Sequence, residues 1–331
     1  MPFPGKRNRI KLGLAVVAAV VIAVGAGIGS ADASTRKHWW GGGRHPQPPA
    51  SASPAASRTT GAPSPAASAT PTTPAPTSPR PTATGTPTKS GTWAPPPANA
   101  GFDYQIGGAY SPPAGVGVVS RDHDASPAAG LYNICYVNAF QAQTEANAWW
   151  KSNHPDLLLH DAQGNLVVDK DWNEILLDFS TADKRAALTA IVGGWMDGCA
   201  GKGFKGVEPD NLDSWTRSGG RLTKAQAIAY AQSLVAHGHG KGLAVAQKNT
   251  ADLDTASVRQ IGFDFAVAEE CADYDECQNY TASYGGNVIV IEYSQSQFTK
   301  ACGAYGSTLS IVLRDVDVTT PGSGSYVFKS C

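Results

Sequence analysis

Eight short apolar runs rich in β-branched residues recur in the second half of the chain, and segments with helical periodicity separate several of them. The runs are residues 116–121, 131–138, 174–179, 204–209, 242–247, 263–268, 287–293 and 308–314. Strands that alternate with helices predict a parallel sheet, because parallel neighbours need a crossover connection. Eight such repeats predict an α/β fold of the closed (β/α)8 TIM-type barrel class rather than an open sheet.

Two kinds of pattern mark the helices between these runs. Apolar residues at i, i+3, i+4 and i+7 occur over 188–195 and 298–305, which indicates amphipathic helices. Thr223 and Gln226 have the spacing of a capping box and predict a helix that begins there and ends near Gly238. The crossover 122–130 is too short for a full helix, and no helical pattern follows residue 314. The run 102–107 fits an extra strand or a cover at the bottom of the barrel.

The first hundred residues differ in composition from the rest. A basic cluster precedes the apolar run LGLAVVAAVVIAVGAGIG, and a small-x-small cleavage pattern follows it. Residues 1–33 are therefore predicted to be a signal peptide, with an uncleaved membrane anchor as the alternative because the run is long. Of the 23 prolines, 15 lie between Pro46 and Pro97, so residues 34–100 are predicted to be a disordered Pro/Ser/Thr/Ala-rich linker. The barrel domain then occupies residues 101–331, in a secreted or cell-surface-associated protein.

Charge is divided unevenly along the chain. All but one of the 27 acidic residues but only 16 of the 26 basic residues lie in 101–331, so this region carries a net −10 against −1 for the whole chain. An acidic domain disfavours nucleic acid and attracts cationic ligands. Ordinary solubility explains the same excess, so charge alone identifies no ligand. No phosphate-binding glycine-rich loop follows any run, and we expect no cofactor and no protein partner.

All six cysteines lie in the predicted domain. In an oxidising compartment an even number predicts up to three disulfides, with 15 connectivities open. The short separation of Cys271 and Cys277 suits a local bridge. We expect no metal site, because no Cys-x-x-Cys pair or nearby histidine has the spacing of metal ligands.

Polar or ionisable residues end every predicted strand. In (β/α)8 barrels the active site lies at the carboxyl ends of the strands, where the βα loops begin. These ends carry Asp122, Tyr136, Asp178, Asp210, Lys248, Glu269, Glu292 with Tyr293, and Arg314 with Asp315. A full ring is hard to explain as ordinary loop polarity, because gathering several unpaired carboxylates is costly without a ligand.

The stretch KGVEPDNLDSW, residues 205–215, places Asp210 at the end of the fourth predicted strand. Asn211 and Asp213 follow in the loop. A turn at Asp210 and Asn211 and a helix cap at Asp213 are the structural alternatives. Trp215 comes directly afterwards and is expected to stack on a sugar ring.

The stretch AVAEEC ends the sixth predicted strand with Glu269 and Glu270. Only one of the two can face the site, because neighbouring strand residues point to opposite faces. Asp210 and Glu269, two strands apart, can supply the carboxyl pair of glycoside hydrolysis, in which one group donates a proton and the other acts as nucleophile or activates water. Metal binding is the competing use, but the compact spacing of a calcium loop is missing. Lys248 is expected to bind a sugar hydroxyl, to keep a carboxylate ionised, or to form an ion pair.

Several of these stretches, taken in order, resemble the motifs of glycoside hydrolase family 114, the endo-α-1,4-polygalactosaminidases. They are VEPDN with Asp213, QKN at 247–249, AVAEEC with YDEC at 274–277, and IEY at 291–293. The likeness covers 102–331 and implies a (β/α)8 enzyme that cleaves α-1,4-linked galactosamine polymers with retention. The chain departs from the family at CYVNAF, residues 135–140, where a tyrosine-phenylalanine-serine-like run is more usual, and this leaves the polymer open.

By motif, the resemblance assigns catalysis to Asp210 and Glu269. Retaining α-galactosidase barrels have a nucleophilic aspartate directly before an asparagine on strand four; by this further resemblance Asp210 is the nucleophile and Glu269 the acid/base. The remaining polar groups at the mouth are then expected to bind substrate: Asp122, Tyr136, Asp178, Asn211, Asp213, Trp215, Lys248, Glu292 and Tyr293.

The expected partner is a cationic amino-sugar polysaccharide, which an acidic domain would concentrate. Two other functions stay open: a non-catalytic carbohydrate-binding barrel on a surface stalk, and a retaining α-galactosidase-like enzyme. The presence of both acids favours an enzyme over a binding barrel that has lost its chemistry.

Overall fold

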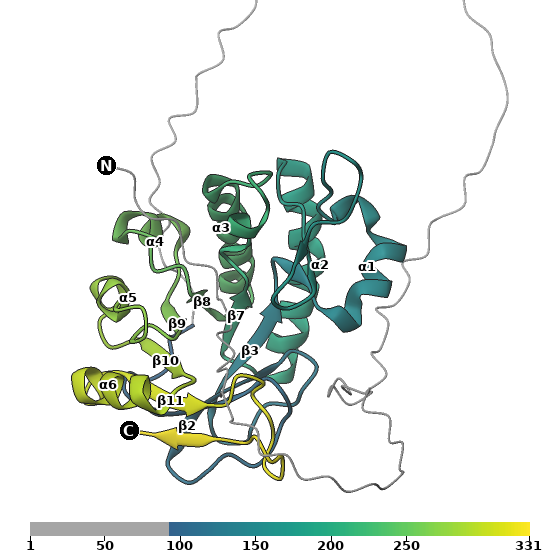
Figure 1. Cartoon of the computed structure of the whole chain (residues 1–331). Helices are drawn as coiled ribbons and strands as arrows, with labels where there is room; N and C mark the ends of the chain where they lie inside the picture. The colour runs from purple at the N-terminus through teal and green to yellow at the C-terminus, as the bar shows by residue number, and fades with distance from the viewer. Residues whose placement is uncertain (1–92) are drawn as a thin grey trace, which may run out of the picture. The chain divides into compact units, whose positions relative to one another are not determined.

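The computed structural model describes residues 93–331, and a nearly closed barrel of eight parallel strands forms their centre (Figure 1). In sheet order the strands are β1 (Gly101–Gln105), β2 (Val116–Asp122), β3 (Tyr132–Asn138), β7 (Gly206–Asp210), β8 (Ala244–Lys248), β9 (Phe265–Glu269), β10 (Val288–Glu292) and β11 (Ser310–Arg314). A last strand, β12 (Phe328–Ser330), pairs antiparallel with β11. The predicted (β/α)8 class is confirmed.

Side chains alternate between the barrel interior and the helix layer along each strand, as the two-residue period of a strand requires. On β8, Ala244 and Ala246 pack in the interior, whereas Val245 packs in the outer core. On β10, Ile289 faces inward and Val290 outward. Residues that continue the inward series therefore emerge at the carboxyl ends of the strands.

The predicted strands differ from the observed ones at two positions. Residues 174–179 do not form a barrel strand: β6 (Glu174–Leu176) lies in a separate antiparallel sheet between β4 (Gln141–Ala142) and β5 (Val168–Asp169). The run 102–107 supplies the first barrel strand instead. An apolar run does not reveal its pairing partner, so periodicity alone did not separate the two. Because the errors offset, β7 remains the fourth barrel strand and β9 the sixth.

Helices cover most of the outside of the barrel (Figure 1). They are α2 (Ala182–Lys202), α3 (Lys224–Gly240), α4 (Thr255–Ile261), α5 (Cys277–Tyr284) and α6 (Gln295–Tyr305), while α1 (Asn147–Asn153) belongs to the insert between β3 and β7. Three short 3₁₀ helices are η1 (Thr144–Ala146), η2 (Pro155–Leu157) and η3 (Ser214–Arg217). The helices predicted over 188–195 and 298–305 are confirmed. The predicted capping box is confirmed as well. The Thr223 hydroxyl accepts from the backbone N–H of Gln226, and the Gln226 side chain accepts from the backbone N–H of Thr223.

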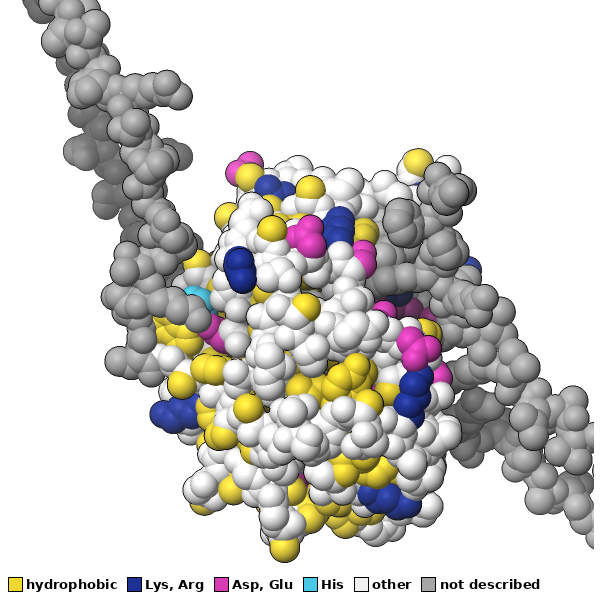
Figure 2. All heavy atoms as spheres, turned by 90° about the vertical axis from the view of Figure 1, so that its left-hand side faces the viewer, with side chains coloured by type: hydrophobic (Ala, Val, Ile, Leu, Met, Phe, Trp, Pro, Cys, Tyr) yellow, Lys and Arg dark blue, Asp and Glu magenta, His cyan; other side chains and the backbone are white. Residues whose placement is uncertain are grey.

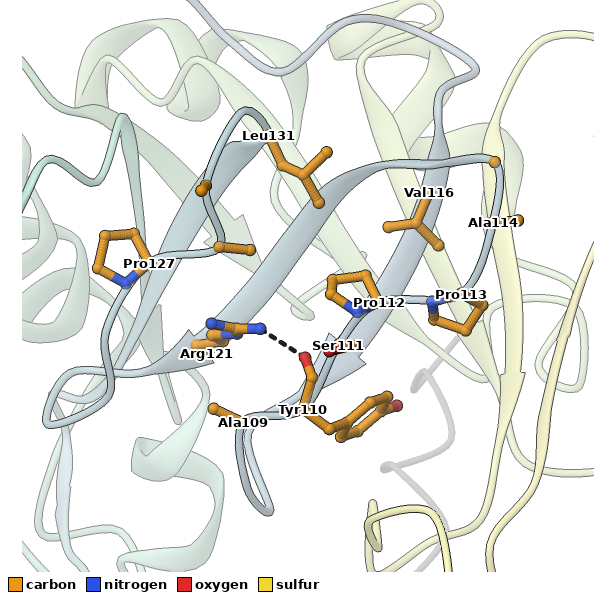
Figure 3. Close-up of a pocket in the computed structure, with 13 residues that line it drawn as sticks. Ala109, Tyr110, Ser111, Pro112, Pro113, Ala114, Val116, Arg121, Pro127 and Leu131 are labelled. Carbon is orange, nitrogen blue, oxygen red and sulfur yellow. Dashed lines mark hydrogen bonds between the residues drawn. The ribbon is translucent and has the colours of Figure 1, made fainter.

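Loops take the place of helices after β1 and β2 in the described part of the chain. Arg121 holds both loops against the outer face of the sheet. Its Nη2 donates to the Tyr110 carbonyl at 2.7 Å, its Nη1 to the Ser126 carbonyl at 2.7 Å, and its Nε to Gln105 at 2.9 Å. Between the loops lies a hollow of about 610 Å³ lined mainly by alanine, proline and aliphatic side chains (Figure 3). As predicted, the crossover 122–130 has no helix, and none follows β11.

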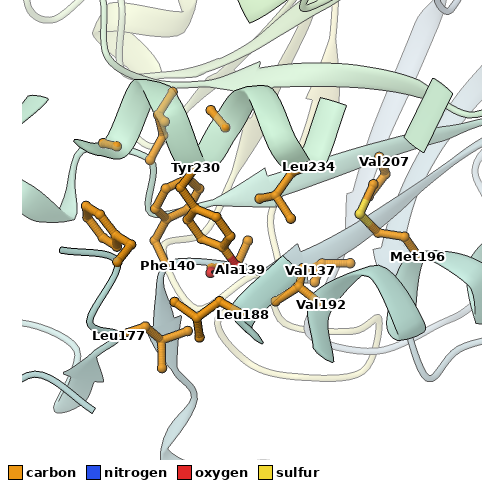
Figure 4. Close-up of a cluster of buried hydrophobic side chains, with 14 of the residues drawn as sticks. Val137, Ala139, Phe140, Leu177, Leu188, Val192, Met196, Val207, Tyr230 and Leu234 are labelled. Carbon is orange, nitrogen blue, oxygen red and sulfur yellow. Dashed lines mark hydrogen bonds between the residues drawn. The ribbon is translucent and has the colours of Figure 1, made fainter. Parts of the chain in front are cut away.

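The main outer core lies where α2 and α3 pack on β3 and β7 (Figure 4). Its fully buried members include Leu188, Val192 and Met196 of α2, Tyr230 and Leu234 of α3, and Val137 and Val207 of the sheet. Disulfides reinforce the helix layer: Cys135–Cys199 joins β3 to α2, and Cys302–Cys331 joins α6 to the chain end. The predicted local bridge Cys271–Cys277 is confirmed in the loop after β9.

Two further contacts close the barrel. Across the seam between β1 and β11, Arg314 pairs with Asp103 at 3.2 Å, and both side chains are fully buried. At the bottom, Trp93 stacks on His239 and donates to Asp264. The end of the predicted linker, from Trp93 to residue 100, therefore contacts the barrel.

The predicted signal peptide or anchor, and the linker up to residue 92, lie outside the described residues. Within 93–331, no helix is both long enough and apolar enough to cross a bilayer. On the face that carries α4, α5 and α6, acidic and basic side chains lie next to one another (Figure 2). The acidic excess of the domain is therefore not gathered on this face.

Candidate active site

The end of β7 delivers two carboxyl groups to the barrel mouth. Val207 packs in the outer core, so Glu208 and Asp210 lie on the alternate positions of the strand, where Glu208 accepts from Tyr104 and Asp210 accepts from Tyr136. The ladder between β7 and β3 continues to Asp210, but the ladder to β8 is limited to Gly206 and Val207. Pro209 has no N–H to donate to a ladder, and the pairing with β8 ends before it.

Lys248, the last residue of β8, lies at the centre of the site. Its Nζ is 2.7 Å from Glu208 Oε1 and 2.8 Å from the Tyr104 hydroxyl. The same atom is 3.5 Å from Asp210 Oδ1 and 3.5 Å from Glu269 Oε2. These two oxygens are thus no farther apart than twice that distance, and the structure brings both predicted catalytic carboxyls to one point.

Exposure separates the carboxyl groups around Lys248. The side chains of Lys248 and Glu208 are 1% and 0% exposed, whereas those of Asp210 and Glu269 are 17% and 18% exposed. A ligand at the mouth can therefore reach Asp210 and Glu269 but not the pair beneath them. Ser120 and Tyr104 donate hydrogen bonds to the two oxygens of Glu208, so its buried carboxylate is satisfied.

Both exposed carboxyls are held by hydrogen-bond donors. Tyr136 donates to Asp210 Oδ2 at 2.8 Å, and the Asn211 amide donates to Oδ1 at 2.7 Å. The Tyr293 hydroxyl donates to Glu269 Oε1. The Asn249 side chain donates to Glu269 Oε2 at 2.8 Å and accepts from the Glu269 amide at 2.9 Å, which fixes the glutamate from both ends.

The electrostatics of the group keep its donors protonated. Burial favours neutral Lys248, but Asp210, Glu208 and Glu269 outweigh burial and raise its pKa well above the ordinary value. Burial raises the pKa of Glu208, against the attraction of Lys248. Burial, together with nearby carboxylates, also raises the pKa values of three tyrosines well above their usual range: Tyr104, Tyr136 and Tyr293.

The insert adds one carboxyl that the sequence did not predict. Glu174 of β6 accepts at Oε2 from Asn138 at 2.9 Å and from Asn211 at 3.4 Å. Burial raises the pKa of Glu174 to about 8, opposed by the Asn138 hydrogen bond and supported by the charges of Asp210 and Asp169. The small sheet therefore places a second acid beside Asp210.

Other predicted residues of the β7 loop contribute less directly. Arg217 pairs with Asp213 at 3.1 Å and with Asp169 at 2.7 Å, and it donates to the Asn211 side chain at 3.1 Å. Asp213 thus fixes the loop through Arg217 and makes no side-chain cap of η3. Trp215 is partly buried against the outer core.

Three predicted binding residues are engaged elsewhere. Asp122 accepts from the Asp124 amide in the turn after β2. Asp178 pairs with Lys184 at 2.5 Å near the start of α2, because its strand belongs to the insert. Glu292 continues the outward series of β10 and accepts from the Ala272 amide at 2.9 Å, whereas Tyr293 continues the inward series.

A metal site and the hollow of Figure 3 offer less chemistry than the mouth. Asp122, His123 and Asp124 can bring three ligand atoms within 4.8 Å of one another, but such partly exposed acidic groups are common without a metal. The hollow has no carboxyl group in its lining (Figure 3). The mouth has two reachable carboxyls around one cation, which is the equipment for acid/base and nucleophilic chemistry at a glycosidic bond.

Comparison with known proteins gives one matching family and several similar structures. No curated protein sequence matches the chain. The structure is similar to the crystal structure of Ega3 from Aspergillus fumigatus in complex with galactosamine, with a TM-score of 0.60 and 23% identity over 73% of this chain and 98% of the Ega3 chain in that structure. It is also similar to the glycoside hydrolase domain of PelA from Pseudomonas aeruginosa, with a TM-score of 0.46 and 13% identity over 69% of this chain and 98% of that domain. The model of glycoside-hydrolase family GH114 matches residues 82–331, most of the chain and the whole barrel, so this protein belongs to that family and is a glycoside hydrolase.

Proposed function

We propose that the protein is a secreted, endo-acting hydrolase of α-1,4-linked galactosamine-type polysaccharide, with Asp210 as nucleophile and Glu269 as general acid/base. The observation that carries the proposal is the convergence of these two reachable carboxyls, each 3.5 Å from the Nζ of Lys248. Such a pair is what a glycosidase requires on either side of the bond that it cleaves.

In the first step, an Asp210 oxygen attacks the anomeric carbon from the face opposite the departing oxygen. Glu269 gives its proton to that oxygen, the glycosidic bond breaks, and the sugar becomes an ester of Asp210. The hydrogen bonds from Tyr136 and the Asn211 amide fix the direction of the attacking carboxylate. Those from Tyr293 and Asn249 fix Glu269.

In the second step, ionised Glu269 takes a proton from water while the water oxygen attacks the anomeric carbon. The bond to Asp210 breaks, and its carboxylate is regenerated. Two inversions leave the product with the configuration of the substrate. Retention requires carboxyl groups about 5–5.5 Å apart, and the shared contact with Lys248 is compatible with that spacing.

Three further observations support an amino-sugar polymer outside the cell. The domain carries a net charge of −10, which favours a cationic chain over a neutral one. The similar structure of Ega3 contains galactosamine. Three disulfides are the usage expected in an oxidising compartment, which supports secretion.

The test is chain cleavage measured on defined polymers. The protein is incubated with partly deacetylated α-1,4-galactosamine polymer, its fully acetylated form and an α-galactoside, and the products are separated by size. We expect internal cleavage of the deacetylated polymer, with kcat lower by about 10²–10⁴-fold in Glu269→Gln and at least as low in Asp210→Asn.

The matched control is Asp183→Asn, an equal change of charge at an exposed position on the first turn of α2. It is expected to cleave as the wild type does. Binding of the polymer without cleavage by the wild type would show a carbohydrate-binding barrel instead, and release of galactose from the α-galactoside alone would show the other enzyme class.

A further inference from the structure

Lys248 is placed to act on the two catalytic carboxyls rather than on a sugar. Its side chain is 1% exposed and lies beneath Asp210 and Glu269. Two of its hydrogen-bond partners, Glu208 and Tyr104, belong to the barrel interior. A buried ammonium with these partners has no open side to offer a ligand at the mouth.

The polar groups around Lys248 come from six strands. A third carboxylate, Glu208, compensates the buried cation directly, and the Glu208–Lys248 pair as a whole is neutral. Facing Lys248 are Glu208 and Asp210 of β7, Glu269 of β9, Tyr104 of β1, Tyr136 of β3 and, just past β10, Tyr293. Ser120 of β2 holds the far oxygen of Glu208.

The distances from Lys248 to the two catalytic carboxyls are equal, at 3.5 Å each. During the first proposed step, negative charge leaves Asp210, which becomes an ester, and appears on Glu269, which loses its proton. During the second step, the charge returns. A fixed cation at the same distance from both groups faces one negative charge throughout the cycle and does not have to move, which is electrostatic preorganisation.

We propose that Lys248 is a positioning residue that acts as the shared counter-ion of Asp210 and Glu269 in both steps, with Glu208 anchoring it between them. The proposal rests on the catalytic roles given under the proposed function and names the group that serves them both. It assigns Glu208 a role without contact to substrate, because its carboxyl is fully buried.

Three variants separate this role from a merely structural one. Lys248→Met alone leaves Glu208 buried without its cation and is expected to fold poorly. The double variant Lys248→Met with Glu208→Gln removes both charges with side chains of similar size, and the introduced glutamine keeps hydrogen-bond partners in Tyr104 and Ser120. Glu208→Gln alone keeps the cation and removes its compensating charge.

The two foldable variants are expected to move the pH profile in opposite directions. In Glu208→Gln, the uncompensated cation favours ionised Asp210, so the acid limb of kcat/KM moves to lower pH. In the double variant, no cation favours ionisation, so the acid limb moves to higher pH than in the wild type. A structural role predicts that the double variant, once folded, has the wild-type profile.

The two steps are measured separately with an activated aryl α-glycoside of a galactosamine oligomer, by the burst of aryl alcohol and by the steady-state rate. We expect both rates to fall by about 10²–10³-fold in the double variant. A fall in only one rate would overturn the shared role, and so would an unchanged pH profile in a double variant that melts with the wild type.

A measurement independent of activity keeps the two proposals apart. Carboxyl carbon NMR of the wild type and the double variant is expected to show the Asp210 and Glu269 side chains ionising at higher pH in the double variant, because the cation that favours their ionised forms is gone. If the wild type cleaves no galactosamine substrate but the titrations shift as stated, the proposed substrate fails and the counter-ion role stands. If the titrations of the two proteins coincide, the counter-ion role fails.

Discussion

Glu292→Gln tests the interpretation of the barrel by its effect on stability. Glu292 is fully buried on the outer side of β10, where one oxygen accepts from the Ala272 amide and the other has no hydrogen-bond partner among the described residues. Burial raises its pKa to about 7; the charges of Glu270 and Asp273 add to the effect, while Lys300 opposes it. Glutamine keeps the shape and the acceptor and removes the ionisation.

The sign of the effect follows from proton linkage. The unfolded carboxyl ionises around pH 4.5, and the folded one only around pH 7, so the folded state binds more protons between these values. Below pH 4.5 the raised pKa of Glu292 does not lower the free energy of unfolding. The loss of stability grows as the pH rises from 4.5 to 7 and is complete above pH 7. At 1.36 kcal/mol per pKa unit, Glu292→Gln can raise the free energy of unfolding by at most about 3 kcal/mol. Because relaxation of the loop after β9 reduces this loss in the wild type, we expect a gain of about 1–3 kcal/mol.

The assay is the free energy of unfolding by urea at about pH 4, below the ordinary pKa of a glutamate, and at about pH 8.5, above the folded pKa. Glu292→Gln is expected to match the wild type at the lower pH and to be more stable by about 1–3 kcal/mol at the higher pH. Glu145→Gln, the same change at an exposed position, is the control and is expected to show no such difference. A Glu292→Gln protein that is less stable than the wild type at pH 8.5 would refute the placement of Glu292 in an apolar outer layer.

Two more predictions concern the seam and the acid/base. Arg314→Met leaves Asp103 buried without its cation and is expected to lower the free energy of unfolding by about 3–5 kcal/mol. Adding Asp103→Asn in the same chain should restore most of this loss. An unaltered urea midpoint in Arg314→Met would contradict the role of this ion pair in closing the barrel. Tyr293→Phe removes a hydrogen bond to Glu269 and is expected to lower kcat on the polymer about 10-fold or more without changing the melting temperature; wild-type kcat would contradict its orienting role.

The strand-end rule predicted that Asp210 and Glu269 meet at the barrel mouth, and it could do so because it depends on local alternation and strand order. Asp210 and Glu269 lie at the ends of the fourth and sixth barrel strands even though one predicted strand was misplaced. The same alternation predicts that Glu208, two residues before Asp210, also faces the barrel interior. It also predicts that Glu292 faces outward if its neighbour Tyr293 faces inward, as the structure has them. These residues were predictable from the sequence with a stricter use of the two-residue period.

The insert was not predictable in this way. Glu174 reaches Asn138 and Asn211 because β6 pairs antiparallel with β4 and β5, and this pairing is a tertiary contact that no periodicity encodes. The run 102–107 has the same limitation, since its apolar pattern fits a barrel strand as well as a bottom cover. The sequence therefore locates single strand ends well, but not which strands share a sheet.

The central claim is that Asp210 and Glu269 divide the chemistry of one glycosidic bond between them. Its most direct test is the configuration of the azide adducts formed by Asp210→Ala and Glu269→Ala from an activated aryl α-glycoside of a galactosamine oligomer. If Asp210 is the nucleophile, azide restores turnover of Asp210→Ala and gives the β-glycosyl azide; if Glu269 is the acid/base, azide restores turnover of Glu269→Ala and gives the α-glycosyl azide. Exchange of the two products between the variants would reverse the assigned roles, and wild-type turnover by either variant without azide would contradict the catalytic pair.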